Sequence, residues 1–306
     1  MPFFNDSSYF NGIDDSGQFF LSRMSFRTGR NNEHWLEFYS KEHGLLRKKD
    51  SPGAEGEGFN QGAFSFEMLE PGQSWKIRFD GTMINDSGSP KKVSFDLIYE
   101  ATTPLIDFQH AMMIEQTSRM ISEQKWSKTF FAKLEEMKKM HFEQGGNLKG
   151  TISVEGKAAT YEFSSMRDHS WGKRIWGDWK RHVWICGMLD NGDCINVSMI
   201  AYDFLGQLNA GYYVKNGQVL YLKSCPMMES FASTPLFPAT GELELLFGQE
   251  EKVNLSWNRI HFVPYDMDNG EYKIFEGISK IKMGKQKGNF VTEFGLNPAY
   301  YDVESI

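Results

Sequence analysis

The chain has 306 residues, of which 24% are charged and 40% hydrophobic, and its formal net charge at pH 7 is −7. This composition is typical of a folded globular protein and excludes a disordered chain. The acidic balance argues against a nucleic-acid binder, which needs a basic surface to neutralise phosphates. Aromatic residues make up 15% of the chain, so it can build a large core or line a cavity for an apolar ligand.

The sequence shows no sign of export or membrane insertion. No apolar run approaches the length of about 20 residues that spans a bilayer, and we expect no integral membrane segment. Residues 1–8 lack the basic and apolar parts of a secretory signal. Three cysteines do not form a disulfide framework. We therefore expect a reduced, cytoplasmic protein, and nothing in the sequence indicates its oligomeric state.

Most of the chain follows the pattern of antiparallel β-structure. Short segments rich in Val, Ile, Phe, Tyr and Trp alternate with turn residues. For example, apolar and basic residues alternate over 75–79, directly after the turn Glu70-Pro-Gly-Gln73. Strands are also predicted at 93–99, 211–214, 219–222, 242–247, 252–257, 272–281 and 290–294.

Two hairpins are predicted from Asn-Gly turns. The first joins 182–189 to 194–201 through Asp190-Asn-Gly-Asp193, and the second turns at Lys215-Asn-Gly-Gln218. Asn-Gly supplies the positive φ angles that a type I′ turn requires.

One segment departs from the β pattern. Between about 117 and 143, apolar residues recur three or four positions apart among Lys and Glu, which predicts one long amphipathic helix. Gly145 and Gly146 are expected to end it. From the residues alone we expect a mostly β fold with this one helix and one or two barrels.

Motifs for cofactor binding are absent from the sequence. It contains no Walker loop, dinucleotide fingerprint, H-E-x-x-H, C-x-x-C or nucleophile elbow. The seven histidines are scattered, which argues against a transition-metal site. We expect neither a cofactor nor a metal.

The most unusual composition lies between 166 and 184, where four of the eight tryptophans are interleaved with basic residues and two aspartates. If 163–171 is an extended strand, Arg167, His169 and Trp171 share one face, together with Phe163 and Ser165. Asp168 and Ser170 then point the other way, unless a bulge at Gly172 redirects them.

Two interpretations of this segment remain open. In the structural one, Arg167 and Asp168 form a partly buried ion pair that closes one end of a barrel, with Trp171 as its lid. In the functional one, Asp168 and His169 act on a ligand as acid and base, while the tryptophans shape an apolar cavity.

The same segment resembles a signature of the tandem-lipocalin proteins related to hydroxyneurosporene synthase (carotenoid 1,2-hydratase) and to lipocalin-like pericyclases. The resemblance runs through His141-Phe-Glu-Gln144, then Gly150-Thr-Ile-Ser-Val-Glu-Gly156, then Arg167-Asp-His-Ser-Trp-Gly-Lys-Arg174. Upstream, 69–81 also resembles a strand of this family with its tryptophan and closing glycine. The resemblance is specific from His141 to Trp184, and R-D-H-S-W-G is its strongest part.

This resemblance implies two consecutive lipocalin-like (calycin) antiparallel barrels. We place the first domain at 1–165, including the helix, and the second at 166–306. The family includes hydratases that act on isoprenoids and pericyclases that act on polyenes, as well as lipid carriers. Fold transfers better than reaction between such relatives.

We expect a cofactor-independent hydratase, isomerase or cyclase that acts on an apolar, isoprenoid- or polyene-like molecule. Asp168 is the first candidate acid, Glu143 a reserve acid, and His169 the base or second proton carrier. The expected substrate-binding residues are Arg167, Trp171, Arg174, Trp176 and Trp179. The alternative is a non-catalytic carrier of a lipid, sterol or pigment, which needs a cavity but no acid. A third possibility is a scaffold filled by its own aromatic side chains.

Overall fold

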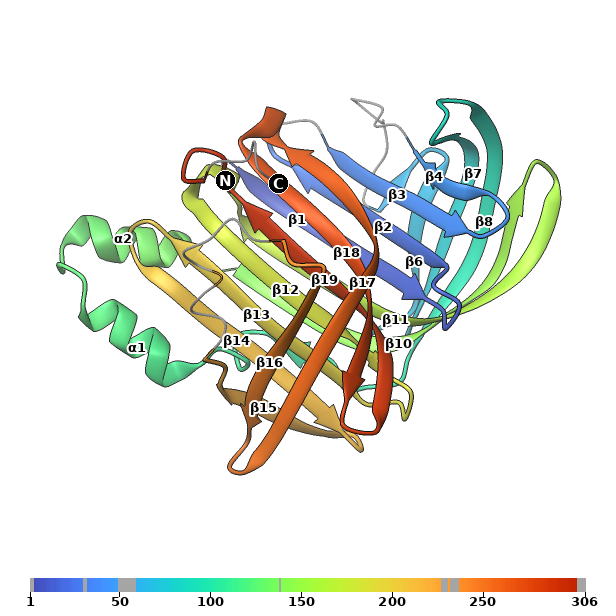
Figure 1. Ribbon diagram of the computed structural model, residues 1–306. Helices are drawn as coiled ribbons and strands as arrows, with labels where there is room; N and C mark the ends of the chain where they lie inside the picture. Colours follow the sequence, from blue (N-terminus) through green and yellow to red (C-terminus); the bar gives the residue numbers. More distant parts are fainter. Residues whose placement is uncertain are drawn as a thin grey trace. The chain divides into compact units, whose positions relative to one another are not determined.

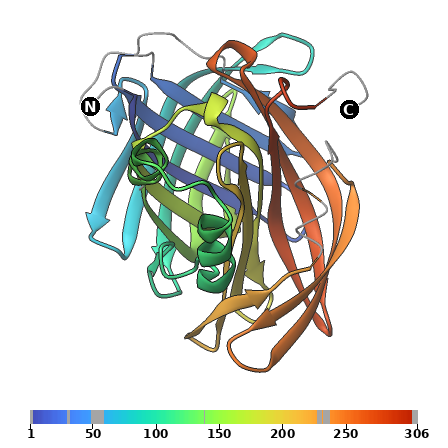
Figure 2. The same ribbon diagram turned by 90° about the vertical axis from the view of Figure 1, so that its left-hand side faces the viewer.

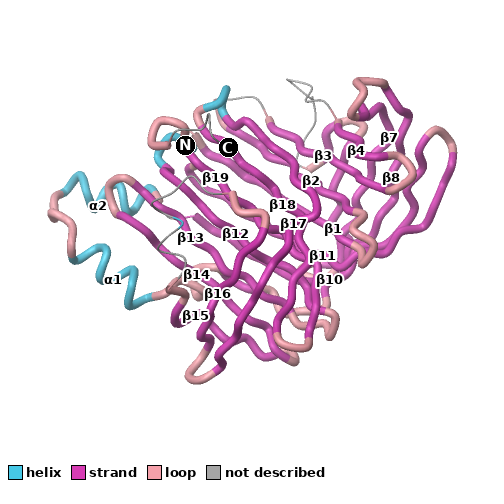
Figure 3. Tube along the Cα trace, viewed as in Figure 1, coloured by secondary structure: helices cyan, strands magenta, loops and turns pink. Residues whose placement is uncertain are grey.

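A computed structural model describes residues 3–29, 32–48, 59–137, 139–226, 231 and 237–301. Strands dominate this part of the chain (Figure 3), which confirms the mostly β class. Backbone contacts divide the chain into two units. The first comprises Met1–Leu105 and Lys139–Lys173, and the second Ile106–Lys138 and Arg174–Ile306. The sequence analysis placed the boundary at 165 and the helix in the first domain, whereas this division changes unit after Lys173 and assigns the helical segment to the second unit.

The first unit is built on an antiparallel sheet with the strand order β4-β3-β2-β1-β11-β10-β8-β7-β6-β5 (Figure 1). Strand β4 also pairs with β7 through Leu46 and Arg47, so the hydrogen-bonded path returns on itself. The strands are β1 (Phe4–Ile13), β2 (Phe19–Arg27), β3 (Glu33–Ser40), β4 (Gly44–Arg47), β5 (Asn60–Gln61), β6 (Phe64–Glu70), β7 (Ser74–Asn85), β8 (Pro90–Ala101), β10 (Lys139–Val154) and β11 (Lys157–Lys173).

Alternation along the strands builds the core of this unit. In β7, Trp75, Ile77 and Phe79 are buried while Arg78 between them is exposed, as the sequence predicts. The ring of Phe10 on β1 lies 5.8 Å from that of Trp75 and 5.5 Å from that of Tyr99. Each such fully buried side chain stabilises the fold by about 1.5–3 kcal/mol.

The second unit contains a closed antiparallel barrel of β12 to β19 in sequence order. Its elements are β9 (Ile106–Asp107), α1 (Ile114–Ser122), α2 (Lys128–Glu136), the 3-10 turn η1 (Trp176–Asp178), β12 (Trp179–Leu189), β13 (Cys194–Tyr202), β14 (Gly206–Lys215), β15 (Gln218–Ser224), β16 (Thr240–Phe247), β17 (Glu251–Met267), η2 (Asp268–Gly270), β18 (Tyr272–Met283) and β19 (Gln286–Leu296).

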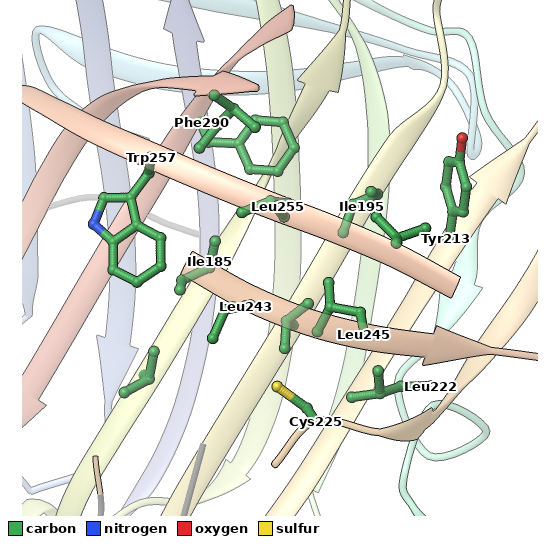
Figure 4. Close-up of a cluster of buried hydrophobic side chains, with 14 of the residues drawn as sticks. Ile185, Ile195, Tyr213, Leu222, Cys225, Leu243, Leu245, Leu255, Trp257 and Phe290 are labelled. Carbon is green, nitrogen blue, oxygen red and sulfur yellow. The ribbon is translucent and has the colours of Figure 1, made fainter. Parts of the chain in front are cut away.

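Apolar side chains from most of the barrel strands form one buried cluster (Figure 4). Ile185 of β12, Leu243 of β16 and Trp257 of β17 are among its members. Both predicted hairpins are present. Asn216 and Gly217 have positive φ, as a type I′ turn requires, but in the 190–193 turn only Gly192 does. The first turn is therefore not type I′.

The prediction of one long helix over 117–143 is wrong. Two shorter helices, α1 and α2, take part of this segment (Figure 2). The side chain of Ser127 accepts a hydrogen bond from the backbone N–H of Phe130 and starts α2 as its N-cap. Lys138 lies outside the described residues, and from Lys139 onward the chain is strand β10.

Pairing with distant strands explains this difference. Strand β10 hydrogen-bonds to β11 along its whole length and to β8 over its second half. Such tertiary pairing outweighs a local helical pattern. Gly145 and Gly146 lie inside this strand rather than at a helix end. A Cβ on Gly146 would lie 2.2 Å from the carbonyl oxygen of Glu100 and 2.8 Å from the Tyr99 ring.

We predict that Gly146→Ala lowers the free energy of unfolding by about 3 kcal/mol, because β10 must move away from β8 to make room for the methyl group. A denaturant titration measures this change. Gly177→Ala is the control, since its added Cβ meets nothing nearer than a Glu271 oxygen at 3.7 Å. Equal unfolding midpoints for the two variants would contradict the packing described here.

Candidate functional site

The R-D-H-S-W-G segment lies near the end of β11, between β1 and β10. Arg167 pairs with Phe10 and Gln144, and His169 pairs with Ser8 and Phe142. Because alternate residues of a strand point to opposite faces, Arg167, His169 and Trp171 lie on one face, and Asp168 and Ser170 on the other. The observed register follows the alternation expected from the sequence.

Arg167 is held inside the first unit by Gln144. The guanidinium donates to Oε1 of Gln144 from Nε at 3.0 Å and from Nη2 at 2.9 Å. It also lies over the rings of Trp75 and Tyr99, 5.6 and 5.9 Å from their centroids. Only 4% of Arg167 is exposed, and this burial lowers the pKa of Arg167. Among the described residues no hydrogen bond joins Arg167 to Asp168, unlike the predicted ion pair, although the charge of Asp168 partly offsets the lowering of the pKa.

Gln144 connects Arg167 to three other parts of the first unit. Its Nε2 donates to the carbonyl oxygens of Gly72 and Thr103, each at 3.0 Å. Its own carbonyl accepts from the Tyr99 hydroxyl at 2.9 Å. Gly72 belongs to the turn predicted at 70–73. The network therefore satisfies a buried charge and ties β10 and β11 to the β6–β7 turn and to the end of β8.

His169 forms a second, separate arrangement on the same face. Its Nε2 lies 2.8 Å from Oδ1 of Asp6 on β1. The side chains of His169 and Asp6 are 24% and 35% exposed, so solvent or a ligand can reach both. No hydrogen bond joins Nδ1 of His169 to any residue that the structure describes. A histidine with one nitrogen held by a carboxylate and the other open is the arrangement of a general base.

Aromatic rings surround His169. The Trp171 ring lies 4.9 Å from the imidazole and stacks on Phe142 at 5.6 Å. The Phe59 ring lies 5.5 Å from the imidazole in a T-shaped arrangement, and it also contacts Phe66 of the core. The His169–Asp6 pair thus lies at the border between the apolar core and solvent.

The opposite face of the same strands carries the two candidate acids. Glu143 and Asp168 pair directly across β10 and β11. His141 lies between them, with Nε2 3.2 Å from Oε1 of Glu143 and 3.9 Å from Oδ2 of Asp168. Glu143 is fully buried and Asp168 is 21% exposed. A small ligand bound to one face of the sheet therefore contacts either Asp168 or His169, but not both.

Three other predicted residues belong to the second unit. The guanidinium of Arg174 lies over the rings of Trp176 and Trp179, 5.4 and 5.8 Å from their centroids. Both tryptophans are buried, and their rings lie 4.9 Å apart. Trp176 also stacks on Tyr272 at 5.2 Å. These residues form a cluster of their own.

A hydrogen-bonded chain that the sequence did not reveal lies beside this cluster. His182 Nδ1 is 2.8 Å from the Tyr272 hydroxyl, and His182 Nε2 contacts Glu293. Burial, together with the charge of Arg181, lowers the pKa of His182 to about 3, while burial raises the pKa of Tyr272. A neutral His182 then donates from Nε2 to Glu293 and accepts the Tyr272 proton at Nδ1. Because barrel pairing joins these distant positions, no local spacing could indicate them.

Asp6 is the other residue that the sequence analysis missed. It lies 163 positions from His169, and only the pairing of β1 with β11 brings the two together.

Among the described residues no group of three His, Cys, Asp or Glu side chains is placed to hold a metal ion. Within the same ranges, none of the helices has the length and apolar character to cross a membrane.

The sequence from 1 to 298 matches the family described as "Domain of unknown function (DUF7064)", and the chain belongs to this family. A comparison with curated proteins found no match. Solved structures with a similar fold include a Nitrosomonas europaea protein provisionally named ATTH. It is 10% identical, with 96% of this chain and 92% of that chain covered and a TM-score of 0.62.

Kievitone hydratase from Nectria haematococca is also similar, at 11% identity, with 99% of this chain and 90% of that chain covered and a TM-score of 0.55. CghA bound to Sch210972 is 6% identical, with 96% and 88% covered and a TM-score of 0.50. At these identities the likeness concerns the fold. Proteins that share this fold include a hydratase.

A buried histidine on the same face as His169 makes the free energy of unfolding depend on pH. His34 of β3 is 5% exposed. The register joins it to His169 through Met24 and Ser8. Burial, and then the charge of Lys48, lower the pKa of His34 to about 4. Between pH 6.5 and 4 the unfolded chain therefore binds a proton at His34 that the folded protein does not bind.

We predict that the free energy of unfolding falls as the pH is lowered from about 6.5 to 4, by up to about 3 kcal/mol from His34. In His34→Gln this contribution is lost, so the variant should lose less stability over the same range. Urea unfolding at pH 7.5, 6, 5 and 4.5 measures both profiles. Parallel profiles for wild type and variant would show that the imidazole of His34 is not held neutral by its surroundings.

Proposed function

We propose that the protein is a cofactor-independent enzyme of the hydratase, isomerase or cyclase type, acting on a hydrophobic isoprenoid- or polyene-like molecule, with His169 as its acid–base residue. The observation that carries this proposal is the Asp6–His169 pair, in which Nε2 is held at 2.8 Å and Nδ1 has no hydrogen bond among the described residues. The partial exposure of both side chains allows a substrate to reach them.

Asp6 acts as a positioning residue in this proposal. Its carboxylate keeps the proton of the neutral imidazole on Nε2, so the lone pair of Nδ1 is available to accept a proton. The protonated ring, stabilised by the same carboxylate, can return that proton to another atom of the substrate. A hydration, a double-bond isomerisation and a cyclisation that begins with protonation all need such a transfer.

The aromatic residues supply the apolar surroundings of the reaction. Trp171, Phe142 and Phe59 present rings to the imidazole or to each other. Such rings can contact a polyene and stabilise positive charge that develops on it. Arg167 is bound to Gln144 and lies over two core rings. We propose that Arg167 supports the strand that carries His169 and does not contact the substrate.

The fold supports this proposal by analogy. Kievitone hydratase shares the fold, and the R-D-H-S-W-G signature resembles that of hydratases and pericyclases. The β4–β7 pairing makes the first unit consistent with a second lipocalin-like barrel. The acids Asp168 and Glu143 lie on the opposite face of the same strands and would contact a ligand bound on that face.

A test begins with finding what the protein converts. Purified protein is incubated with a panel of polyenes and terpenoids, and the products are identified by mass spectrometry. For a converted substrate, His169→Gln should lower kcat about 100-fold or more, because the proton carrier is lost. Asp6→Asn should lower it less, since the imidazole remains but its orientation and tautomer are no longer fixed.

Asp168→Asn is the matched control, because Asp168 is the neighbour of His169 on the other face of β11. It should keep kcat within a few-fold of wild type. A large loss in Asp168→Asn with unchanged turnover in His169→Gln, both variants being folded, would assign the reaction to the Asp168–His141–Glu143 face. An intact lipid recovered in stoichiometric amount, with no conversion of any panel member, would favour the carrier.

A further inference from the structure

The loop between α1 and α2, together with the first turn of α2, presents aromatic side chains to solvent. Trp126 is 63% exposed and Phe131 is 46% exposed, and their rings lie 5.6 Å apart. All eight tryptophans fall within the described residues, and of these Trp126 is the most exposed to solvent. Leaving two large rings exposed to water is unfavourable, and a binding partner that covers them would remove this cost.

The two helices are fixed to the barrel of the second unit, so this aromatic pair has a defined position. The backbone N–H of Asn209 on β14 donates to Oε1 of Gln116 at 2.9 Å, and Gln124 Nε2 donates to the carbonyl of Leu205. Phe130 is buried and its ring lies 6.3 Å from that of Phe204. Its neighbour Phe131 is 46% exposed, so its ring is open to solvent although the helix is fixed to the barrel.

Two lysines lie next to the aromatic pair in the sequence, although the whole protein is acidic. Lys125 and Lys128 flank Trp126 in the sequence, and both are exposed. From 119 to 133 there are four basic residues and one acidic residue, and Glu135 and Glu136 follow at the end of α2, in a chain of net charge −7. Trp126 donates from Nε1 to the carbonyl of Ile121 at 3.0 Å, which orients the indole at the end of α1.

We propose that Trp126, Phe131, Lys125 and Lys128, here called the Trp126 patch, bind the surface of an anionic lipid bilayer. Tryptophan is enriched at the membrane–water interface. Apolar side chains combined with lysines give reversible binding to anionic lipids. Each lysine near such a surface contributes about 1 kcal/mol, or about a fivefold change in affinity. This inference does not depend on catalysis, and an apolar ligand would be taken from or delivered to such a bilayer.

The exposed area favours a bilayer over a second copy of the chain. Two aromatic side chains bury about 150–250 Å² each, whereas a standard protein interface buries about 800 Å² on each partner. A bilayer needs no complementary shape, and its negative charge matches the lysines.

Cosedimentation with vesicles tests the proposal. The wild type should bind vesicles of phosphatidylcholine and phosphatidylserine, and bind vesicles of phosphatidylcholine alone much more weakly. Lys125→Glu/Lys128→Glu should lower the partition coefficient by about tenfold or more. Trp126→Ala/Phe131→Ala should lower it by about tenfold as well, because the inserted apolar area is lost.

The hairpin between β18 and β19 offers a matched control. Lys285 and Lys287 are exposed, and Lys285→Glu/Lys287→Glu changes the net charge by the same amount as the patch variant. Circular dichroism checks the fold of every variant. The proposal predicts a much smaller loss of binding for this control than for the patch variant.

Three results would overturn the proposal. They are no binding of the wild type to anionic vesicles, equal losses in the patch and control charge variants, and a wild-type dimer that Trp126→Ala/Phe131→Ala converts to monomer. The last result would mean that a second copy covers the patch.

Discussion

The antiparallel pairing of β11 with β1 on one side and β10 on the other determines which residues of the R-D-H-S-W-G segment lie together. Because each step along a strand reverses the direction of the side chain, six consecutive residues cannot form one cluster. Arg167 and His169 face the core of the first unit, while Asp168 faces Glu143 and His141. Residues that are adjacent in the sequence, such as Asp168 and His169, therefore lie on opposite faces of the sheet.

This separation reconciles the two interpretations of the segment, because they apply to different residues. Arg167 carries a buried charge, and the cost of removing it from water is offset by two hydrogen bonds to Gln144 and by the faces of Trp75 and Tyr99. Gln144 makes the remaining bonds of its amide to Gly72 and Thr103. We therefore propose a structural role for Arg167, while the same strand presents His169 at the border of the core.

Local patterns in the sequence indicated much of the fold. The alternation around Trp75, the Asn216-Gly217 turn and the faces of 163–171 all agree with the structure. The predicted helix failed because 139–143 carries apolar residues that fit either period, and only pairing with β8 and β11 decides between them. The prediction that Gly146 ends a helix is wrong for the same reason. Gly146 lies inside a strand, where the absence of a side chain leaves room for the Tyr99 ring.

The partners of the candidate residues were less predictable. Asp6 reaches His169, and Tyr272 and Glu293 reach His182, across strands that lie far apart in the sequence. The residue types of the proposed site, such as His169 and Trp171, could be singled out from composition. Their hydrogen-bond partners depend on strand register, which a single sequence does not specify.

The central claim is that Asp6 holds the proton of His169 on Nε2 and leaves Nδ1 able to accept another. Nitrogen-15 NMR of the imidazole side chains tests it most directly, with the His169 signals assigned by comparison with His169→Gln. At a pH where the ring is neutral, we expect the Nε2–H tautomer in the wild type and a mixture of tautomers in Asp6→Asn. A wild-type ring protonated on Nδ1, or identical spectra for the two proteins, would contradict the account.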